Sequence, residues 1–168
     1  AETLVTQALT VARQMLPGLR VVVYESPEPQ DPLQDDFDLV ATYTVPDDEG
    51  LYIQRLGILE WQLFASVSYL AANGAPETLE DLAQHALWLH YLPSTSTSTL
   101  PLRSGSALEV TPFCATTNPS AVLHAVEQGL GIGFLPRQLW GTAATARPLL
   151  ERRVGQERSL YLVAGSRQ

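Results

Sequence analysis

The stretch Asn118–Pro136, NPSAVLHAVEQGLGIGFLP, decides the fold because it predicts a helix followed at once by a buried strand. Asn118 suits the cap before a helix, since its side chain can accept a bond from a first-turn amide, and Pro119 suits the first helical position. Gly129 offers a left-handed stop for the helix. The apolar run 132–135, closed by a proline, then predicts a buried strand.

The loop before this helix, residues 114–118 (CATTN), is the first candidate ligand site. The first turn of a helix carries unpaired amides and the positive end of the helix dipole, so it favours negative charge. We therefore expect a small anionic molecule to bind there. The residues alone leave an equal alternative, in which Asn118 is a plain helix cap without a ligand.

Composition restricts the partners. The chain has 168 residues and a formal net charge of -8, from 18 acidic side chains against 10 basic ones, and the basic ones are all arginine. Direct binding of this chain to nucleic acid is not expected, because a basic face is what contacts phosphates. The absence of lysine removes Schiff-base chemistry and the phosphate-loop lysine.

Cysteine usage and hydropathy suggest the compartment. Cys114 is the only cysteine, so no disulfide can form within the chain, and we expect a cytoplasmic protein. No window is apolar enough for a membrane span and no leader pattern is present, so no membrane partner is expected. Because the chain starts at Ala1 rather than at methionine, we expect it to be a fragment of a longer protein.

The remaining pattern alternates helices and strands, which predicts an α/β fold with a mixed sheet whose strands are mostly parallel. Residues 69–72 and a segment capped by Thr78 with Asp81 are expected to be helical. Residues 51–58 and 60–66 are close enough to form a hairpin. The other expected elements are a helix over 4–16, strands over 19–24, 37–44, 107–113 and 158–164, a connection over 26–36 and a loop over 94–99.

No group of residues predicts catalysis, a metal site or a cofactor. His85 and His90 are one residue too far apart for a helical metal pair, and packing or surface roles are favoured for them and for His124. Cys114 has no base in its local sequence and is expected to be a small buried residue. We therefore predict a binding protein, not an enzyme, with no cofactor and no metal.

Four segments in order resemble the effector-binding domain of LysR-type transcriptional regulators. The resemblance covers nearly the whole chain. It rests on Phe37, Asp38, Leu39, Val40 and Ala41, then on Phe64, Ala65, Ser66, Tyr69, Leu70, Gly74, Pro76, Leu79, Leu82 and His85, then on Ala125, Gly129, Leu130, Gly131, Ile132 and Pro136, and finally on a strand over 160–163.

The resemblance implies a fold like that of the type 2 periplasmic binding proteins, with two lobes, mixed sheets, flanking helices and two crossing strands. Lobe I would comprise residues 1–64 and 162–168, and lobe II residues 65–161. The crossings would lie near 64–68 and 160–164. Val67 stands where the family usually has proline, which makes the first crossing less rigid.

The resemblance also implies a small-molecule effector in the cleft between the lobes. Carried over by position, the effector contacts would be Thr42, Tyr43, Ser66, Thr116, Thr117 and Asn118, with Gly133 and Phe134 as pocket wall, and Arg55 as a weaker candidate for an anion partner. A homodimer or higher homo-oligomer is implied, and DNA would be bound only by a winged helix-turn-helix domain outside this chain. A solute-binding protein for uptake with the same fold is the alternative.

Overall fold

The computed structural model describes residues 2–24, 26, 37–45, 47, 50–92, 94–140 and 145–165, and for residues 2–7 the backbone only. Its elements, in chain order, are α1 (Glu2–Met15), β1 (Val40–Thr42), β2 (Leu51–Ser66), α2 (Val67–Asn73), η1 (Glu80–Gln84), β3 (Leu87–His90), β4 (Thr99–Pro101), β5 (Ala107–Glu109), β6 (Cys114–Thr116), α3 (Pro119–Glu127), β7 (Ile132–Pro136), η2 (Arg137–Leu139), β8 (Ala146–Leu149) and β9 (Gln156–Gly165). The η elements are 3₁₀ helices.

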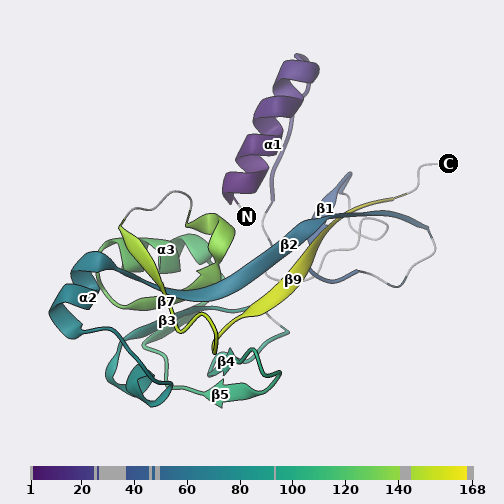
Figure 1. Ribbon diagram of the computed structural model, residues 1–168. Coiled ribbons are helices and arrows are strands. Elements are labelled where there is room, and N and C mark those ends of the chain that lie inside the picture. Colours follow the sequence, from purple (N-terminus) through teal and green to yellow (C-terminus); the bar gives the residue numbers. More distant parts are fainter. Residues whose placement is uncertain are drawn as a thin grey trace.

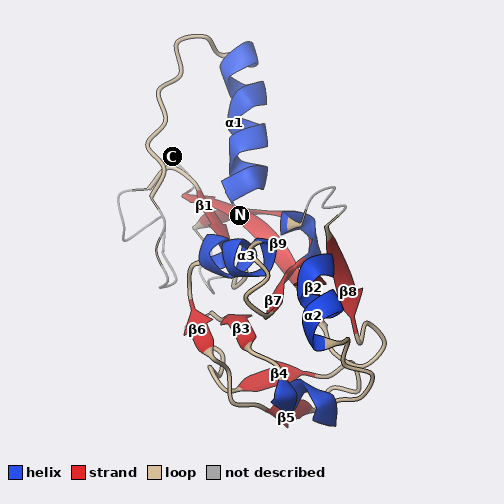
Figure 2. Ribbon diagram, turned by 90° about the vertical axis from the view of Figure 1, so that its left-hand side faces the viewer, coloured by secondary structure: helices blue, strands red, loops and turns tan. Residues whose placement is uncertain are grey.

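The main sheet is mixed, as predicted. Its strand order is β1-β9-β2-β7-β3-β6, with β8 also paired to β2, and a separate hairpin joins β4 to β5. β3 runs parallel to β6 and β7, and the other described pairs are antiparallel. The expectation of mostly parallel strands is therefore wrong, because β2 pairs antiparallel with β7, β8 and β9. Helix α3 covers one face of β3 and β7, and the β4–β5 hairpin lies on the other side (Figure 1, Figure 2).

The predicted helix-then-strand segment is confirmed. The Oδ1 atom of Asn118 accepts a hydrogen bond from the Ser120 amide at 2.9 Å, and Gly129 has the left-handed φ of 70°. Val122 and Val126 on α3 are fully buried. A Cβ atom on Gly133 would lie 2.6 Å from Cγ2 of Val126, so glycine lets the helix pack directly on β7.

The predicted hairpin over 51–66 is wrong, because these residues form one continuous strand. β2 pairs with β9 from Leu51 opposite Gly165 to Trp61 opposite Gln156, with an irregularity between Arg55 and Gly57. At Trp61 the strand passes from β9 to β7, which it follows to Ala65. A single glycine produces a local irregularity here, whereas a hairpin needs a turn of two or more residues. The lobe boundaries stay a prediction.

The predicted strand over 19–24 is also wrong. These residues have no ladder partner among the described residues, and the side chain of Val22 is 95% exposed. A β-branched run favours extended backbone, but a strand also needs a neighbour to pair with. The strands predicted over 37–44 and 107–113 are shorter than expected, because only β1 and β5 form within them. Residues 27–36 of the predicted connection lie outside the described residues.

The cap predicted from Thr78 and Asp81 is present at the start of η1. The Asp81 amide donates to the Thr78 hydroxyl at 3.3 Å, and the Thr78 amide donates to the Asp81 carboxylate at 2.8 Å. This reciprocal pair is a capping box, and its bonds depend only on neighbours in sequence. The helix that it starts is a short 3₁₀ helix.

Gly131 lies where the start of β7 packs closely against the residue before β3. A Cβ atom at this position would lie 2.2 Å from the Ala86 carbonyl oxygen, which also accepts the Ile132 amide bond at 2.9 Å. We expect Gly131→Ala to lower the free energy of unfolding by about 2 kcal/mol, because backbone must move to make room. Urea denaturation measures this, and Gly57→Ala is the control, since its added methyl meets nothing within 4 Å. Equal stability of the two variants would contradict the prediction.

Candidate functional site

The candidate site lies where the parallel strands of the main sheet end. β3 and β6 end at His90 and Thr116, which are paired in register, and β7 ends beside them at Pro136. In open α/β sheets, ligands bind outside the carboxyl ends of the strands. The long strands β2 and β9 pass this edge, with Trp61 opposite Gln156 and Leu59 opposite Arg158. The edge therefore gathers side chains from five strands.

His90 is the most unusual side chain at this edge. It is 8% exposed, and its ring lies parallel to that of Trp61, with centroids 6.4 Å apart. Burial lowers the pKa of His90 to about 4, with the charge of Arg158 acting in the same direction and a hydrogen bond to the Thr117 backbone opposing it. The imidazole is therefore neutral near pH 7.

The hydrogen bonds of His90 fix which ring nitrogen carries the proton. Nδ1 has no partner, so the bond to the Thr117 carbonyl is assigned to the protonated Nε2. Nδ1 is then a buried acceptor without a donor. A buried polar atom without a partner is costly, so a donor brought against it would stabilise the site.

Tyr43 and Arg158 lie close to Trp61 and His90. The Tyr43 ring meets that of Trp61 edge to face, with centroids 5.3 Å apart. Burial raises the pKa of Tyr43 to about 12, and the charge of Arg158 partly opposes this. The pKa of Arg158 is lowered by its own burial and raised by Tyr43, but an arginine stays charged. Tyr43 is therefore a neutral hydroxyl donor close to a half-buried cation.

A cavity of about 250 Å³ opens beside His90. Leu89 and Phe134 contribute apolar wall, and Gln156 contributes an amide. Its other lining residues are mostly small or carry hydroxyls: Tyr91, Thr95, Ser96, Thr99, Pro101, Gly105, Ser106 and Ala107. Gln156 and Arg158 are two residues apart on β9 and point to the same face of the sheet. A molecule in the cavity would therefore lie near the Arg158 guanidinium, two residues beyond Gln156 on β9.

The loop over 116–118 satisfies much of its own hydrogen bonding. The Thr116 hydroxyl accepts from the Asn118 amide at 3.1 Å, and the Asn118 side chain accepts from the Ser120 amide. Two amides expected to face an anion are therefore already bonded, and Pro119 has none. The loop enters the site chiefly through the bond between the Thr117 backbone and His90.

The other residues predicted from the resemblance divide into two groups. Phe134 lines the cavity, whereas Gly133 contacts α3. The Thr42 hydroxyl closes a turn by donating to the Thr44 carbonyl at 3.1 Å, next to Tyr43. Ser66 lies at the opposite end of the sheet, where it caps α2 by accepting from the Tyr69 amide. Arg55 is exposed on β2, opposite Tyr161.

Sequence reasoning missed Trp61, His90 and Arg158. His90 could have been found from its place at the end of the apolar run Leu87–His90, since residues at the carboxyl end of a buried parallel strand reach the ligand edge. Arg158 begins the predicted strand over 158–164. Trp61 gave no such signal, because a tryptophan inside a strand pattern is typical of a core.

Two further observations concern metal sites and membrane spans. Within the described part of the chain, no three histidine, cysteine, aspartate or glutamate side chains gather as a metal site. No described helix is both long and apolar enough to cross a membrane. The site described above offers hydrogen bonds, one cation and aromatic surface, which together suit recognition of a small molecule.

Fold and site define a class, the two-lobed α/β ligand-binding domains of the periplasmic-binding-protein type. The family model of the LysR substrate binding domain matches residues 1–167. The chain therefore belongs to that family, and the resemblance found in the sequence is confirmed.

Curated relatives are transcriptional regulators. The regulator YhjC of Escherichia coli is 31% identical over 157 residues, which cover 90% of this chain and 52% of the relative. The activator AaeR of Escherichia coli is 28% identical over 123 residues, covering 71% of this chain and 40% of AaeR. This chain spans about half the length of the curated relatives that it matches.

Solved structures share the fold. The regulatory domain of CrgA, a LysR-type transcriptional regulator from Neisseria meningitidis, has a TM-score of 0.83 and 21% identity, over 97% of this chain and 82% of that one. The regulatory domain of AphB from Vibrio vulnificus has a TM-score of 0.75 and 20% identity, over 95% and 83%.

The buried neutral His90 predicts a loss of stability in mild acid. Its pKa is about 4 in the folded chain against 6.5 ordinarily, so between these pH values the unfolded chain binds more protons. Stability therefore falls as the pH drops from 6.5 towards 4, by about 3 kcal/mol in total. Urea denaturation at pH 7, 6 and 5 measures the decline.

The His90→Gln variant should flatten this decline between pH 6.5 and 5. The control is His124→Gln, which changes an exposed histidine on α3 and should keep the decline. A decline of the same size in the His90 variant would show that another group causes it. Aspartate and glutamate contribute mainly below this interval, because their ordinary pKa values are near 4.

Proposed function

We propose that this chain is the effector-sensing part of a LysR-type transcriptional regulator, with the effector bound at the edge that carries His90. The observation that supports this most is His90, which lines the 250 Å³ cavity and whose buried Nδ1 has no partner. A ligand donor would satisfy that atom. The effector contacts proposed are Tyr43, His90 and Arg158, with Phe134 and Gln156 as wall and the 116–118 loop held against His90.

The proposed effector is a small carboxylate that also carries a hydroxyl or another donor. Among the described residues, no carboxylate forms an ion pair with Arg158, so an anionic ligand group can take that place. The Tyr43 hydroxyl, which keeps its proton, would donate to the same group. The donor group of the ligand would hydrogen-bond His90. The hydroxyl-bearing residues that line the cavity would contact the polar remainder of the ligand. The net charge of -8 means that local groups, not global attraction, hold the anion.

The arrangement also suggests how binding is transmitted. Tyr43 follows β1 and Arg158 belongs to β9, whereas His90 and Thr117 belong to the β3 and β6 side of the sheet. A ligand that bonds both groups stabilises one relative arrangement of the two sides, which is a population shift. We propose that this shift reaches a DNA-binding domain elsewhere in the protein, in a homodimer or higher homo-oligomer in the cytoplasm.

A solute-binding protein for uptake is the less favoured alternative. The same cavity would serve it equally, but the matching relatives are transcriptional regulators. An enzymatic role is not proposed either, since the site is a binding arrangement in which His90 is held neutral and bonded to a carbonyl.

The sensor proposal is tested with a panel of small carboxylates and hydroxycarboxylates. A saturable thermal shift is expected for at least one, because a ligand that binds only the folded chain stabilises it. Calorimetry with that ligand should show affinity reduced by about 1.5 to 3 kcal/mol in Arg158→Gln, which loses a charged hydrogen bond, and by about 1 kcal/mol in Tyr43→Phe. The matched controls are Arg152→Gln and Tyr52→Phe, both at exposed positions.

Two results would count against the proposal. One is a folded sample whose melting temperature is raised by none of the carboxylates on the panel. The other is a ligand whose affinity is the same in both site variants as in the unchanged chain, since it would then bind elsewhere.

A further inference from the structure

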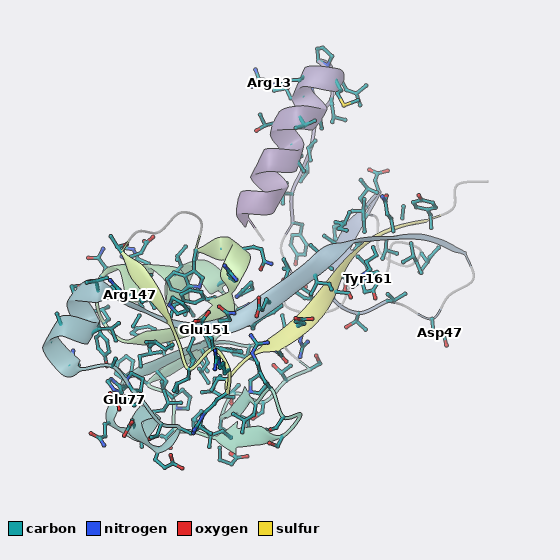
Figure 3. All side chains as sticks on the ribbon, in the orientation of Figure 1. Arg13, Asp47, Glu77, Arg147, Glu151 and Tyr161 are labelled. Atoms are coloured by element: carbon teal, nitrogen blue, oxygen red, sulfur yellow. The ribbon has the colours of Figure 1, made fainter. Side chains whose placement is uncertain are left out.

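A second cavity, distinct from the one beside His90, lies on the α3 face of the sheet. Its volume is about 510 Å³. Residues of β2, η2 and β8 surround it, together with the turn that follows β8: Glu60, Gln62, Phe64, Arg137, Gln138, Trp140, Ala146, Pro148 and Glu151. None of these residues lines the cavity beside His90. Figure 3 labels Glu151 in the turn between β8 and β9, and Arg147 on β8.

Gln62 brings an unpartnered acceptor to this cavity. The side chain is 3% exposed, and its Nε2 donates to the Glu60 carboxylate at 2.8 Å. That carboxylate also pairs with Arg103, which fixes its position. Turning the amide round would place its oxygen against a carboxylate oxygen, so the observed orientation is the favourable one. Oε1 of Gln62 is therefore a buried acceptor without a donor.

Trp140 brings an unpartnered donor to the same cavity. It is 6% exposed, and its Nε1 has no hydrogen-bond partner. Its ring is held against that of Phe64, with centroids 4.4 Å apart, so the indole is not free to turn towards another acceptor. Buried tryptophan N–H groups usually find a partner. Two residues that line one cavity thus hold a buried donor and a buried acceptor without partners.

The charges at the rim are of both signs. Arg137 is exposed, and within the described chain it has no ion pair. Glu151 is also exposed, and Glu60 is already paired with Arg103. A ligand carrying only negative charge would meet Arg137 favourably but Glu151 unfavourably. A ligand carrying both signs would satisfy both.

We propose that this cavity is a second binding site, for a free amino acid or a similarly small amino-carboxylate. The carboxylate accepts from Nε1 of Trp140 and from Arg137. The ammonium group donates to Oε1 of Gln62, and the negative charge of Glu151 favours it. The apolar walls from Phe64, Trp140 and Pro148 receive the ligand side chain. This inference does not rest on the proposed effector site.

The test is calorimetric titration of the chain with a panel of free L-amino acids at millimolar concentration. Binding of at least one is expected, and Trp140→Phe, Arg137→Gln and Gln62→Met should each weaken it by at least about tenfold, the loss of one hydrogen bond to a charged group. Two derivatives of the same amino acid, its N-acetyl form and its carboxamide, should also bind at least about tenfold more weakly.

Matched control variants separate the loss of a ligand contact from a general loss of structure. Trp88→Phe removes another buried indole N–H without a partner, but Trp88 does not line this cavity. Arg147→Gln changes an exposed arginine on β8 whose neighbours Ala146 and Pro148 line the cavity, so it points to the other face. Both should leave binding unchanged.

The proposal is overturned if no amino acid binds to the folded chain, or if Trp140→Phe and Arg137→Gln bind as well as the unchanged chain. Equal weakening by Trp88→Phe or Arg147→Gln would also overturn it. Circular dichroism checks that each variant folds. If Trp140→Phe or Gln62→Met fails to fold, the exposed Arg137 and the two derivatives decide the question.

Discussion

The antiparallel pairing of β2 with β9 is the constraint on which the rest of the structure depends. Its ladder runs from Leu51 opposite Gly165 to Trp61 opposite Gln156, and at Trp61 the strand joins β7. Gln138 supports the same transition, because its side chain accepts from the Glu60 amide and donates to the Ile58 carbonyl, at 3.3 and 3.2 Å. These bonds satisfy backbone groups of β2 just before Trp61, where its pairing with β7 begins.

Both candidate sites take their positions from this pair of strands. Side chains alternate between the two faces of β2, so Trp61 faces the cavity of His90 while Gln62 faces the second cavity. β9 contributes Gln156 and Arg158 to the first site. A ligand at one face and a ligand at the other would therefore contact adjacent residues of one strand. Such adjacency gives a physical route for one site to affect the other.

Local signals in the sequence were accurate. The Asn118 cap, the glycine stop after α3, the buried strand β7 and the capping box of Thr78 and Asp81 were all predicted, because each depends on bonds between residues a few positions apart. Residues 19–24 and 51–66 were mispredicted for the opposite reason. Whether an apolar run becomes a strand, and where that strand ends, depends on a partner distant in the sequence.

The sequence by itself determined the mixed α/β class, the elements around α3 and the family, because periodicity, caps and motif order are local and ordered properties of the chain. Tertiary structure alone decided which side chains meet. It stacked His90 on Trp61, placed Arg158 within reach of both Tyr43 and His90, and separated Ser66 from the 116–118 loop. It also left Gln62 and Trp140 unpartnered at one cavity. Burial and long-range proximity produce these features, and neither has a signature in the spacing of residues.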